Sequence, residues 1–596
     1  METQNRKLRV WAPLASSVEL EIGATVTALK PTGSGWWSGE LAGIGTASEV
    51  DYSLRVDGGA PRPDPRSPWQ PNGVHAASRW VNHADFRWHD GGFQARPLSS
   101  AIIYELHVGT FTSEGTFDGA ISQLDHLMRL GITHVELMPV AEFPGKFGWG
   151  YDGVCLFAPR HAYGGPAGLK HFVDACHRHG LAVILDVVYN HLGPSGNYLE
   201  EFGPYFSDRH RTPWGPAINF DGPYSDGVRR FICDNALMWL RDYHIDALRL
   251  DAVHAIVDTT ARPFLEQLAS EVEQLEAHTG RHLGLIAESD LNDPRIVRPV
   301  EAGGFGLDAQ WCDDFHHALH TALSGERNGY YTDFGTMETL AKAFEQPFVY
   351  AGEHSPFRQR RHGRAAHDLS GHRFITYTQN HDQTGNRARG ERLNHLVNHK
   401  RAKIAAGLVL AGPYVPQLFQ GEEWAAEAPF LYFADWSDEP ELSRAVSSGR
   451  RDEFAAFGWN QDDLFDPTAA ETFQMSKLDW HALAVEEHAN MFDWYQRLIA
   501  LRKSYPALTD GRLDQVSATS CENGRWLLVD RGEIRIIANL SDQPREIPLG
   551  DERQWIVLLS TEEPSSSASY RRALTMPAES LMILSFEREN EIGLTD

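Results

Sequence analysis

The chain has 596 residues, with 54 Lys and Arg against 81 Asp and Glu, which gives a formal net charge of −27. This length exceeds what one hydrophobic core usually supports, so several domains are expected. A chain this acidic disfavours partners such as nucleic acid or an anionic membrane, whereas a neutral substrate such as a sugar is compatible with it. The N-terminal residues show no signal peptide, and no run of about 18 apolar residues predicts a membrane span.

The five cysteines form an odd count without close pairing, at positions 155, 176, 233, 312 and 521. This usage predicts reduced, mostly packed thiols in a cytoplasmic protein, and it matches neither a zinc motif nor a redox motif.

Apolar and polar residues alternate between residues 7 and 57, in short runs separated by Gly and Pro. This pattern predicts a small antiparallel β-sandwich within an N-terminal domain of residues 1–95. A proline-rich segment, residues 61–68, is expected to be an extended strap at the edge of this domain.

Eight apolar runs, interspersed with helical periodicity, predict a (β/α)₈ barrel over residues 96–508. The expected strands are residues 101–107, 133–139, 181–189, 246–251, 283–289, 307–312, 374–380 and 414–420. The expected helices include residues 118–130, 169–179, 228–243 and 490–503. Residues 190–225 lack a clear period, and so long a loop insertion in a compact domain indicates function. After residue 508 short strands return and predict a C-terminal β-sandwich over residues 509–596.

Two of these strands end in carboxylates that suit glycoside hydrolysis. Asp251 ends the fourth strand and Glu288 ends the fifth, and adjacent strands lie about 4.8 Å apart, which suits the short carboxyl separation of a retaining enzyme. Arg249 lies two residues before Asp251, so both side chains share one face of the strand and the guanidinium can orient the carboxylate. We predict Asp251 as the nucleophile and Glu288 as the general acid/base. Taken alone, the Arg–Asp pair has a structural alternative, in which it only closes a strand.

Four short motifs carry a family resemblance, and they lie at residues 186–191, 248–254, 287–289 and 379–382. In this order at the ends of four barrel strands, they resemble the α-amylase family of glycoside hydrolases. The resemblance implies the same (β/α)₈ fold and the same roles for Asp251 and Glu288.

The resemblance also implies roles around the sugar of subsite −1. Asp382 would be the third carboxylate, which holds the sugar hydroxyls, and His191 and His381 would bind the same sugar. Tyr151 matches the aromatic residue on which that sugar stacks, and Arg249 would orient the nucleophile. For each histidine the alternative is a buried residue of the core.

No metal and no other cofactor is expected. Asn190 occupies a position where some members of the family bind calcium, but no cluster of oxygen ligands is evident around it. Asp186 is expected to be structural, and the basic residues between 358 and 364 are interpreted as a solvated loop.

Further segments resemble the trehalose-releasing members of the family, namely residues 148–153, 212–215, 218–223, 286–294 and 308–317. This implies cleavage of the α-1,4 bond next to a terminal trehalose unit in a trehalose-capped malto-oligosaccharide. A maltooligosyltrehalose synthase would act in the same pathway. Cys312 stands where Asn is expected, which leaves the hydrogen bonding at that position open. The alternatives are a glycogen branching or debranching enzyme and a catalytically inactive glucan-binding protein.

Specificity for trehalose requires side chains around subsites +1 and +2. The candidates within or beside these segments are Trp214, His254, Asp290, Trp311 and Asp314. For the two tryptophans the alternative is that they pack the loops.

Overall fold

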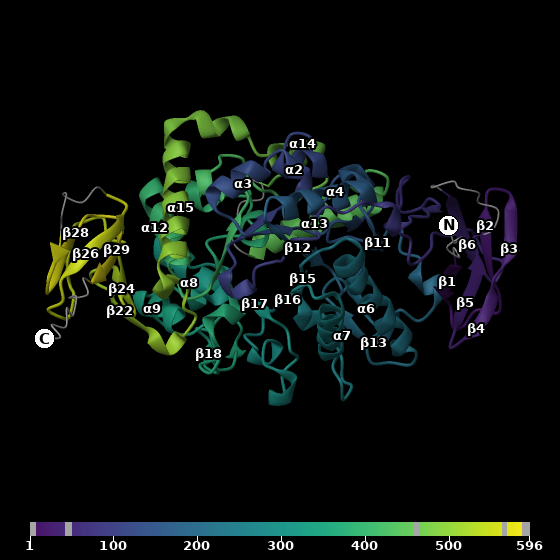
Figure 1. Ribbon diagram of the computed structural model, residues 1–596, viewed down its shortest axis with the longest axis horizontal. Helices are drawn as coiled ribbons and strands as arrows, with labels where there is room; N and C mark the ends of the chain where they lie inside the picture. The colour runs from purple at the N-terminus through teal and green to yellow at the C-terminus, as the bar shows by residue number, and fades with distance from the viewer. Residues whose placement is uncertain (1–6, 42–49, 457–463, 563–568, 587–596) are drawn as a thin grey trace, which may run out of the picture.

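The computed structural model describes residues 7–41, 50–456, 464–562 and 569–586, without the side chains of residues 452–456. Three parts follow one another along the longest axis of the molecule (Figure 1). An N-terminal β domain lies at one end, a helix-rich central domain follows, and a C-terminal β domain lies at the other end.

The N-terminal domain consists of two antiparallel sheets with strand orders β1-β5-β4 and β3-β2-β6-β7. Its strands are β1 (Lys7–Trp11), β2 (Val18–Ile22), β3 (Thr25–Ala28), β4 (Lys30–Gly33), β5 (Trp36–Glu40), β6 (Asp51–Val56) and β7 (Ser78–Arg79). In β1, Leu8 and Val10 are buried whereas Lys7 and Arg9 are exposed, as the alternating sequence predicts.

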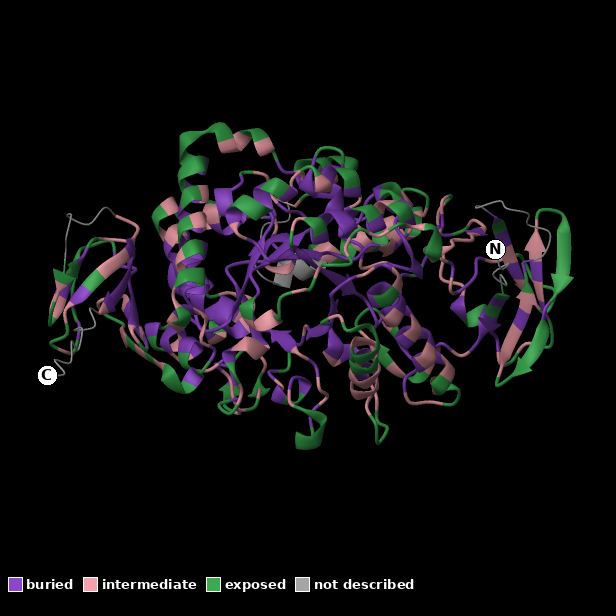
Figure 2. Ribbon diagram, in the orientation of Figure 1, coloured by how far each residue is buried: buried purple, intermediate pink, exposed green. Residues whose placement is uncertain are grey.

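The central domain is built on a closed barrel of eight parallel strands in the order β12-β15-β16-β17-β20-β21-β8-β9. The strands are β8 (Ile103–Leu106), β9 (His134–Leu137), β12 (Ala182–Val187), β15 (Ala247–Leu250), β16 (Gly284–Ala287), β17 (Ala309–Trp311), β20 (Phe374–Tyr377) and β21 (Val415–Phe419). Each lies within a run predicted from the sequence, so the barrel prediction is confirmed. Figure 2 shows the barrel buried beneath its helices, whose outer surfaces are exposed.

Among the helices around the barrel are α2 (Phe117–Ile121), α3 (Leu124–Leu130), α4 (Gly165–Arg178), α6 (Ser225–Asp242), α7 (Phe264–Thr279), α8 (Asp313–Ser324), α10 (His381–Gly385), α12 (His399–Leu410) and α15 (Glu486–Ser504). The helix predicted over residues 118–130 is divided into α2 and α3. The Ser122 hydroxyl donates to the Gly119 carbonyl at 2.6 Å, a local side-chain bond that competes with continuation of the helix. The long loop after β12 contains the hairpin of β13 (Phe206–Thr212) and β14 (Gly215–Ile218), with Trp214 at its turn.

The side chains inside the barrel form layers, each contributed by every second strand. One layer is entirely isoleucine: Ile103, Ile184, Ile286 and Ile375, all fully buried. The strand register places two polar layers above it toward the carboxyl ends of the strands, first Glu136, Arg249, Trp311 and Gln417, then Glu105, Asp186, Glu288 and Tyr377. A dry aliphatic layer therefore supports the charged groups of the site.

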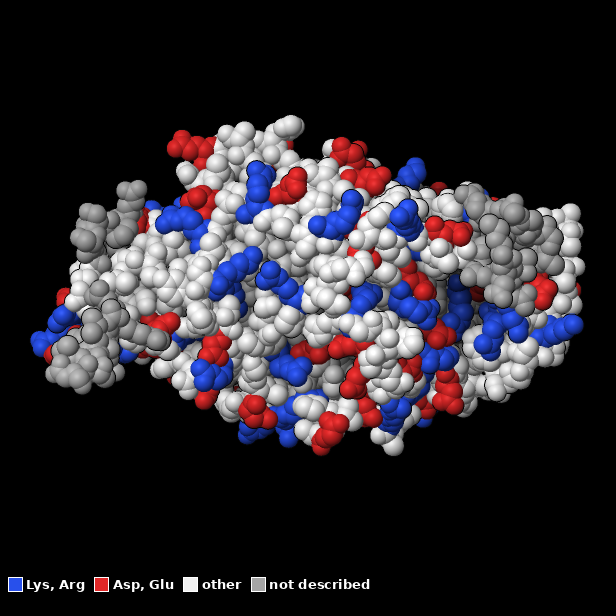
Figure 3. Space-filling model, in the orientation of Figure 1, with Lys and Arg blue, Asp and Glu red and all other residues white. Residues whose placement is uncertain are grey.

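The C-terminal domain pairs a six-stranded antiparallel sheet, β22-β23-β24-β29-β26-β27, with the two-stranded sheet β25-β28. The strands are β22 (Val516–Cys521), β23 (Trp526–Arg531), β24 (Ile534–Asn539), β25 (Arg545–Pro548), β26 (Trp555–Ser560), β27 (Ser569–Tyr570), β28 (Ala573–Met576) and β29 (Ser580–Phe586). Trp555, Ile547 and Met576 lie in the core that the two sheets share. Acidic and basic side chains are interspersed over the face of the whole molecule shown in Figure 3. Among the described residues, no helix combines the length and apolar character needed to span a membrane.

Candidate active site

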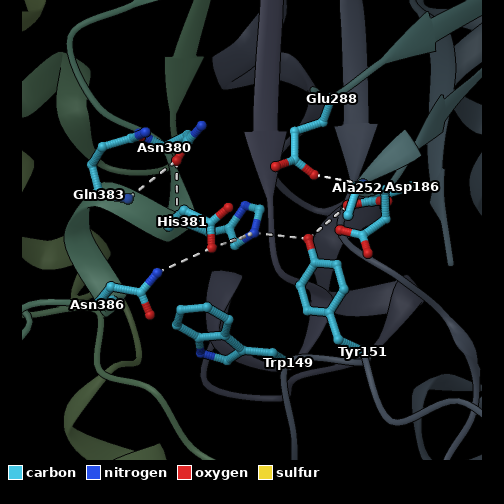
Figure 4. A network of polar contacts seen from close by, with 12 residues as sticks. Trp149, Tyr151, Asp186, Ala252, Glu288, Asn380, His381, Gln383 and Asn386 are labelled. Carbon is cyan, nitrogen blue, oxygen red and sulfur yellow. Dashed lines mark hydrogen bonds and ion pairs between the residues drawn. The ribbon is translucent and has the colours of Figure 1, made fainter. Parts of the chain in front are cut away.

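The motif residues converge at the carboxyl end of the barrel strands (Figure 4). Asp251 and Glu288 directly follow β15 and β16, which pair in parallel with Leu250 beside Ala287. Asp382 lies in the first turn of α10, soon after β20. The three predicted catalytic carboxylates therefore lie at the end of the barrel where such folds place their active sites.

Arg249 connects three carboxyl groups from inside the barrel. Its Nη1 donates to both oxygens of Asp186, at 2.9 and 2.8 Å, and to Oδ1 of Asp251 at 2.9 Å. Its Nη2 donates to Oε2 of Glu288 at 3.1 Å. The guanidinium is fully buried and lies 4.1 Å from the centre of the Trp311 ring. One rigid fork thus fixes Asp251 and Glu288 relative to each other.

Asn190 is a second support of Asp251. Its amide Nδ2 donates to Oδ2 of Asp251 at 2.7 Å and to the Asp251 carbonyl at 2.8 Å. Its Oδ1 contacts Nδ1 of His191. This contact could not be predicted from the sequence, because sequence spacing does not show which neighbour an amide faces.

Glu288 lies in surroundings that favour its protonated form. Burial raises the pKa of Glu288, Arg249 opposes this, and the nearby Asp251 and Asp382 charges raise it further, to about 8. Its Oε2 accepts from the Ala252 backbone N–H at 2.7 Å. Ala252 has φ of +39°, a strained left-handed conformation immediately after Asp251. Glu288 can therefore hold a proton at neutral pH, as a general acid must.

Tyr151 and His381, both predicted to bind the sugar of subsite −1, contact each other. The Tyr151 hydroxyl lies 2.7 Å from Oδ2 of Asp186 and 2.8 Å from Nε2 of His381, and the two rings stack with centres 5.3 Å apart. Figure 4 shows the hydroxyl between these two partners. The Asp382 side chain is 38% exposed, and Asn386 donates to it at 3.3 Å.

His191 and Trp214 lie on the side of the long loop. Nε2 of His191 lies 3.1 Å from the carbonyl oxygen of Tyr151, and burial lowers the pKa of His191. The Trp214 ring stacks on the His191 ring with centres 4.9 Å apart, and Trp214 is 50% exposed. An exposed tryptophan beside a predicted sugar-binding histidine offers a stacking surface.

His254 and Asp290 lie beyond Asp251 and Glu288. The Asp290 backbone N–H lies 3.4 Å from Nδ1 of His254. The Asp290 carboxylate is held by Arg358, whose Nη1 donates to it at 2.8 Å. Arg358 comes from the hairpin of β18 (His354–Ser355) and β19 (Arg360–Arg361). The interpretation of this basic segment as a solvated loop is therefore wrong for Arg358, because a carboxylate distant in sequence pairs with it.

Trp311 and Asp314, both predicted to contact the sugar, are built into the scaffold. Trp311 is 3% exposed beneath the Arg249 guanidinium, because its strand position points into the barrel. Asp314 accepts from the backbone N–H groups of Val349 and Tyr350, at 2.7 and 3.1 Å, and from a neighbouring Asn side chain. This geometry favours a structural role for both side chains.

Asp313 is the carboxylate of this segment that faces the other polar groups of the barrel. It accepts from the Tyr377 hydroxyl at 2.5 Å and from Gln383 at 3.3 Å, and burial raises its pKa to about 7. Asp313 is not among the predicted site residues, although it lies two residues beyond an inward-facing position of its strand, the spacing that identified Asp251. At Cys312, where Asn was expected, the thiol contacts the Pro347 carbonyl at 2.8 Å.

Among the residues that the structure describes, no group of three or more His, Cys, Asp or Glu side chains is arranged to hold a metal ion. Asn190, the position considered for calcium, uses its amide on Asp251 instead.

Comparisons with known proteins identify the class. Residues 82–212 match the family model of the α-amylase catalytic domain, and residues 512–583 match a domain of unknown function, DUF3459. A crystal structure from Salmonella typhimurium, described as a candidate α-amylase, superposes with a TM-score of 0.88 at 36% identity and covers 97% of both chains. The fold and the site thus define a glycoside hydrolase of the α-amylase family.

Two curated relatives narrow the class further. The chain is 48% identical to a malto-oligosyltrehalose trehalohydrolase from Arthrobacter ramosus, over 91% of this chain and 94% of the relative. It is 46% identical to a protein of the same name from Mycobacterium tuberculosis, over 96% of this chain and 99% of the relative. The chain belongs to the malto-oligosyltrehalose trehalohydrolases. The resemblance to trehalose-releasing enzymes predicted from the sequence is confirmed.

Proposed function

We propose that this enzyme cleaves the α-1,4 bond next to the terminal trehalose unit of a trehalose-capped malto-oligosaccharide, with retention at the anomeric carbon. Asp251 is the nucleophile and Glu288 the general acid/base. The observation that supports this most strongly is the Arg249 guanidinium, which holds a carboxylate and a proton-bearing carboxyl on two adjacent strands. Adjacent strands lie about 4.8 Å apart, the spacing of the retaining rather than the inverting mechanism.

The reaction then has two steps. Glu288 gives its proton to the glycosidic oxygen while an oxygen of Asp251 bonds to the anomeric carbon, so that trehalose leaves with the proton. Glu288, now a carboxylate, takes a proton from water, whose oxygen displaces Asp251 and frees the shortened malto-oligosaccharide. Asp382, His381 and Tyr151 hold the ring of subsite −1 during both steps.

The test of this mechanism is the Asp251→Asn variant together with the anomer of the first product. Asn keeps the shape of Asp251 and can still accept from Arg249, so the variant should fold and lose at least a thousand-fold in kcat, about 4 kcal/mol of transition-state stabilisation. NMR of the wild-type reaction should show the α-anomer at the new reducing end before mutarotation. A first-formed β-anomer, or an Asn variant with substantial activity, would remove Asp251 from this role.

The second test concerns Glu288. A Gln at this position cannot protonate the leaving oxygen. The rate of hydrolysis should therefore fall far more for the natural substrate than for aryl glycosides with good leaving groups. Equal losses on both substrates would assign Glu288 another role.

We further propose that Trp214, His254 and Asp290 line subsites +1 and +2 and select trehalose over maltose. A buried polar group that the wrong sugar leaves without a partner costs about 1–3 kcal/mol, and several such groups give strong discrimination. Maltopentaose and its trehalose-terminated counterpart, offered in parallel, should differ clearly in kcat/KM. Equal cleavage of both, or new α-1,6 branches formed from amylose, would instead favour an amylase or a branching enzyme.

The substrate must come from an enzyme that converts the reducing end of a malto-oligosaccharide into a trehalose unit, which is the chemistry of a maltooligosyltrehalose synthase. The five cysteines carry free thiols and four of them are buried, which supports placement in a reducing compartment such as the cytoplasm. A pull-down or co-expression assay with such a synthase, and fractionation of cells, would test these two proposals.

A further inference from the structure

Two glutamates lie side by side inside the barrel, in the two polar layers that also contain Arg249 and Asp186. Glu105 in β8 pairs in register with Glu136 in β9, and each residue is only 1% exposed. Neither belongs to one of the four family motifs. Isolated carboxylates are rarely buried this deeply, so each requires a physical reason.

Both carboxylate oxygens of Glu105 contact His381. Oε1 lies 2.5 Å from Nδ1 of the His381 ring, and Oε2 accepts from the His381 backbone N–H at 3.1 Å. The His381 side chain is 1% exposed. Its remaining ring nitrogen, Nε2, faces the hydroxyl of Tyr151 at 2.8 Å.

In Glu136, in contrast, neither oxygen has a hydrogen-bond partner among the described residues. Burial raises the pKa of Glu136 well above its usual value, and the nearby charge of Glu105 raises it further. The neutral form of Glu136 therefore predominates at neutral pH.

The protons available to the hydrogen bonds around Tyr151 determine the protonation state of the His381 ring. The hydroxyl of Tyr151 has one proton but two close partners, Asp186 and Nε2 of His381. Asp186 also accepts two bonds from Arg249, as a carboxylate does. Both contacts of Tyr151 are satisfied when its own proton goes to Asp186 and His381 supplies a proton from Nε2. Nδ1 needs a second proton to bond to Glu105.

From this arrangement we infer that Glu105 is a positioning residue of the reaction, which keeps both ring nitrogens of His381 protonated and so fixes Tyr151 as the wall of subsite −1. The chain of contacts runs from Glu105 through His381 and Tyr151 to Asp186, and from there through Arg249 to the nucleophile. Figure 4 shows the part from His381 to Asp186. The inference rests on the proposed place of subsite −1.

The surroundings of His381 agree with a charged ring. The titratable or charged groups that act on it include Glu105, Asp382, Tyr151, Asp186, Arg249, Glu136 and His107. Burial lowers the pKa of His381, but the charges of Asp382 and Glu105 and the hydrogen bond to Glu105 outweigh it and raise the pKa to about 9. His107, whose pKa burial lowers to about 3, is neutral and adds no competing positive charge.

The test is Glu105→Gln, with Glu136→Gln as the matched control. Both variants make the same substitution at paired positions of adjacent strands, but only the first removes a carboxylate from His381. For Glu105→Gln we expect kcat/KM at pH 8 to fall about ten- to a hundred-fold, and the alkaline limb of the pH profile to move to lower pH. For Glu136→Gln, kcat/KM should stay within about two-fold of wild type and the alkaline limb should not move, since Gln resembles the neutral carboxyl.

A second measurement reports the charge of His381 independently of enzyme activity. In protein labelled with ¹⁵N-histidine, the ring nitrogens of His381, assigned with a His381→Gln variant, should show an imidazolium at pH 7.5 in wild type and in Glu136→Gln. In Glu105→Gln they should show a neutral ring. A neutral His381 in the wild-type protein, or an unchanged imidazolium and pH profile in Glu105→Gln, would overturn the inference. The wild-type spectrum decides even if Glu105→Gln does not fold, and it does not depend on the proposed mechanism.

Discussion

The raised pKa of Glu288 has a consequence for stability as well as for catalysis. In the unfolded chain this carboxyl has its ordinary pKa of 4.5, and in the folded protein its pKa is about 8. Between these values the unfolded state releases the proton and the folded state keeps it, so folding becomes less favourable as pH rises from 4.5 to 8. Glu288→Gln removes this cost because Gln cannot ionise. The variant should therefore be inactive as an acid but more stable than wild type.

The magnitude follows from the pH interval. Each pH unit corresponds to 1.36 kcal/mol, so the interval from pH 4.5 to pH 7 gives about 3 kcal/mol. The side chain is 18% exposed to solvent, which screens part of the effect. We expect a gain in the free energy of unfolding of about 1–3 kcal/mol at pH 7, or about 1–4 °C in Tm if the barrel unfolds as one unit. Gln can still accept from the Ala252 N–H, so no hydrogen bond need be lost.

Thermal unfolding of wild type and Glu288→Gln at several pH values measures this gain in stability. The Tm difference between the two proteins should be near zero at pH 4.5, increase through pH 7 and level off above about pH 8. A suitable control is Glu326→Gln, because Glu326 has the opposite shift. Burial raises its pKa, but hydrogen bonds from His320 and Arg387 outweigh this and lower it to about 2. Its contribution to stability is present above pH 4.5 and is lost as pH falls through 2, so this variant should be less stable at pH 7. A Glu288→Gln variant that is less stable than wild type at pH 8, or whose advantage does not vary with pH, would refute the reasoning.

Three further outcomes follow from the same geometry. The pH profile of kcat/KM should fall on the alkaline side near pH 8, as Glu288 in the free enzyme loses its proton. An alkaline decline that already begins below pH 6 would contradict this assignment. Arg249→Lys should lower kcat at least a hundred-fold and lower Tm, since a point charge cannot replace a fork that binds three carboxyl groups; activity near wild type would argue against the fork. Trp214→Ala should raise KM about ten-fold for the trehalose-capped substrate, given about 1–1.5 kcal/mol for one aromatic contact. Leu14→Ala, at an exposed site of the N-terminal domain, should leave KM unchanged, and equal effects of the two substitutions would exclude a sugar contact by Trp214.

The fold could be predicted because its determinants are local. Each barrel strand is a short apolar run, and the carboxylates of the motifs follow directly after such runs, so period and position suffice. Asp251 and Glu288 could be placed beside each other for the same reason, since the parallel register follows from the order of strand and helix.

Contacts between distant segments could not be predicted in this way. Arg358 and Asp290 are 68 residues apart, and Glu105 and His381 are 276 residues apart. No sequence period relates such positions, and their pairing depends on how the loops and strands close around the barrel. Trp311, a candidate for sugar binding with packing as its alternative, is buried beneath Arg249 because its strand position points into the barrel. The alternation along the strand predicts this burial when it is applied to residues 309 and 311 together.

The buried charges of the barrel also explain why the acid can be neutral. Two cations, Arg249 and His381, lie among five buried or mostly buried carboxyl groups: Glu105, Glu136, Asp186, Asp251 and Glu288. Five ionised carboxylates against two cations would leave three uncompensated negative charges in a medium of low polarity, which is strongly unfavourable. Protons on Glu136 and Glu288 reduce this excess. Burial and the neighbouring charges of Asp251 and Asp382 raise the pKa of Glu288 against the opposing effects of Arg249 and the Ala252 N–H. Burial among like charges thus makes Glu288 the group that keeps a proton at neutral pH, as the general acid must.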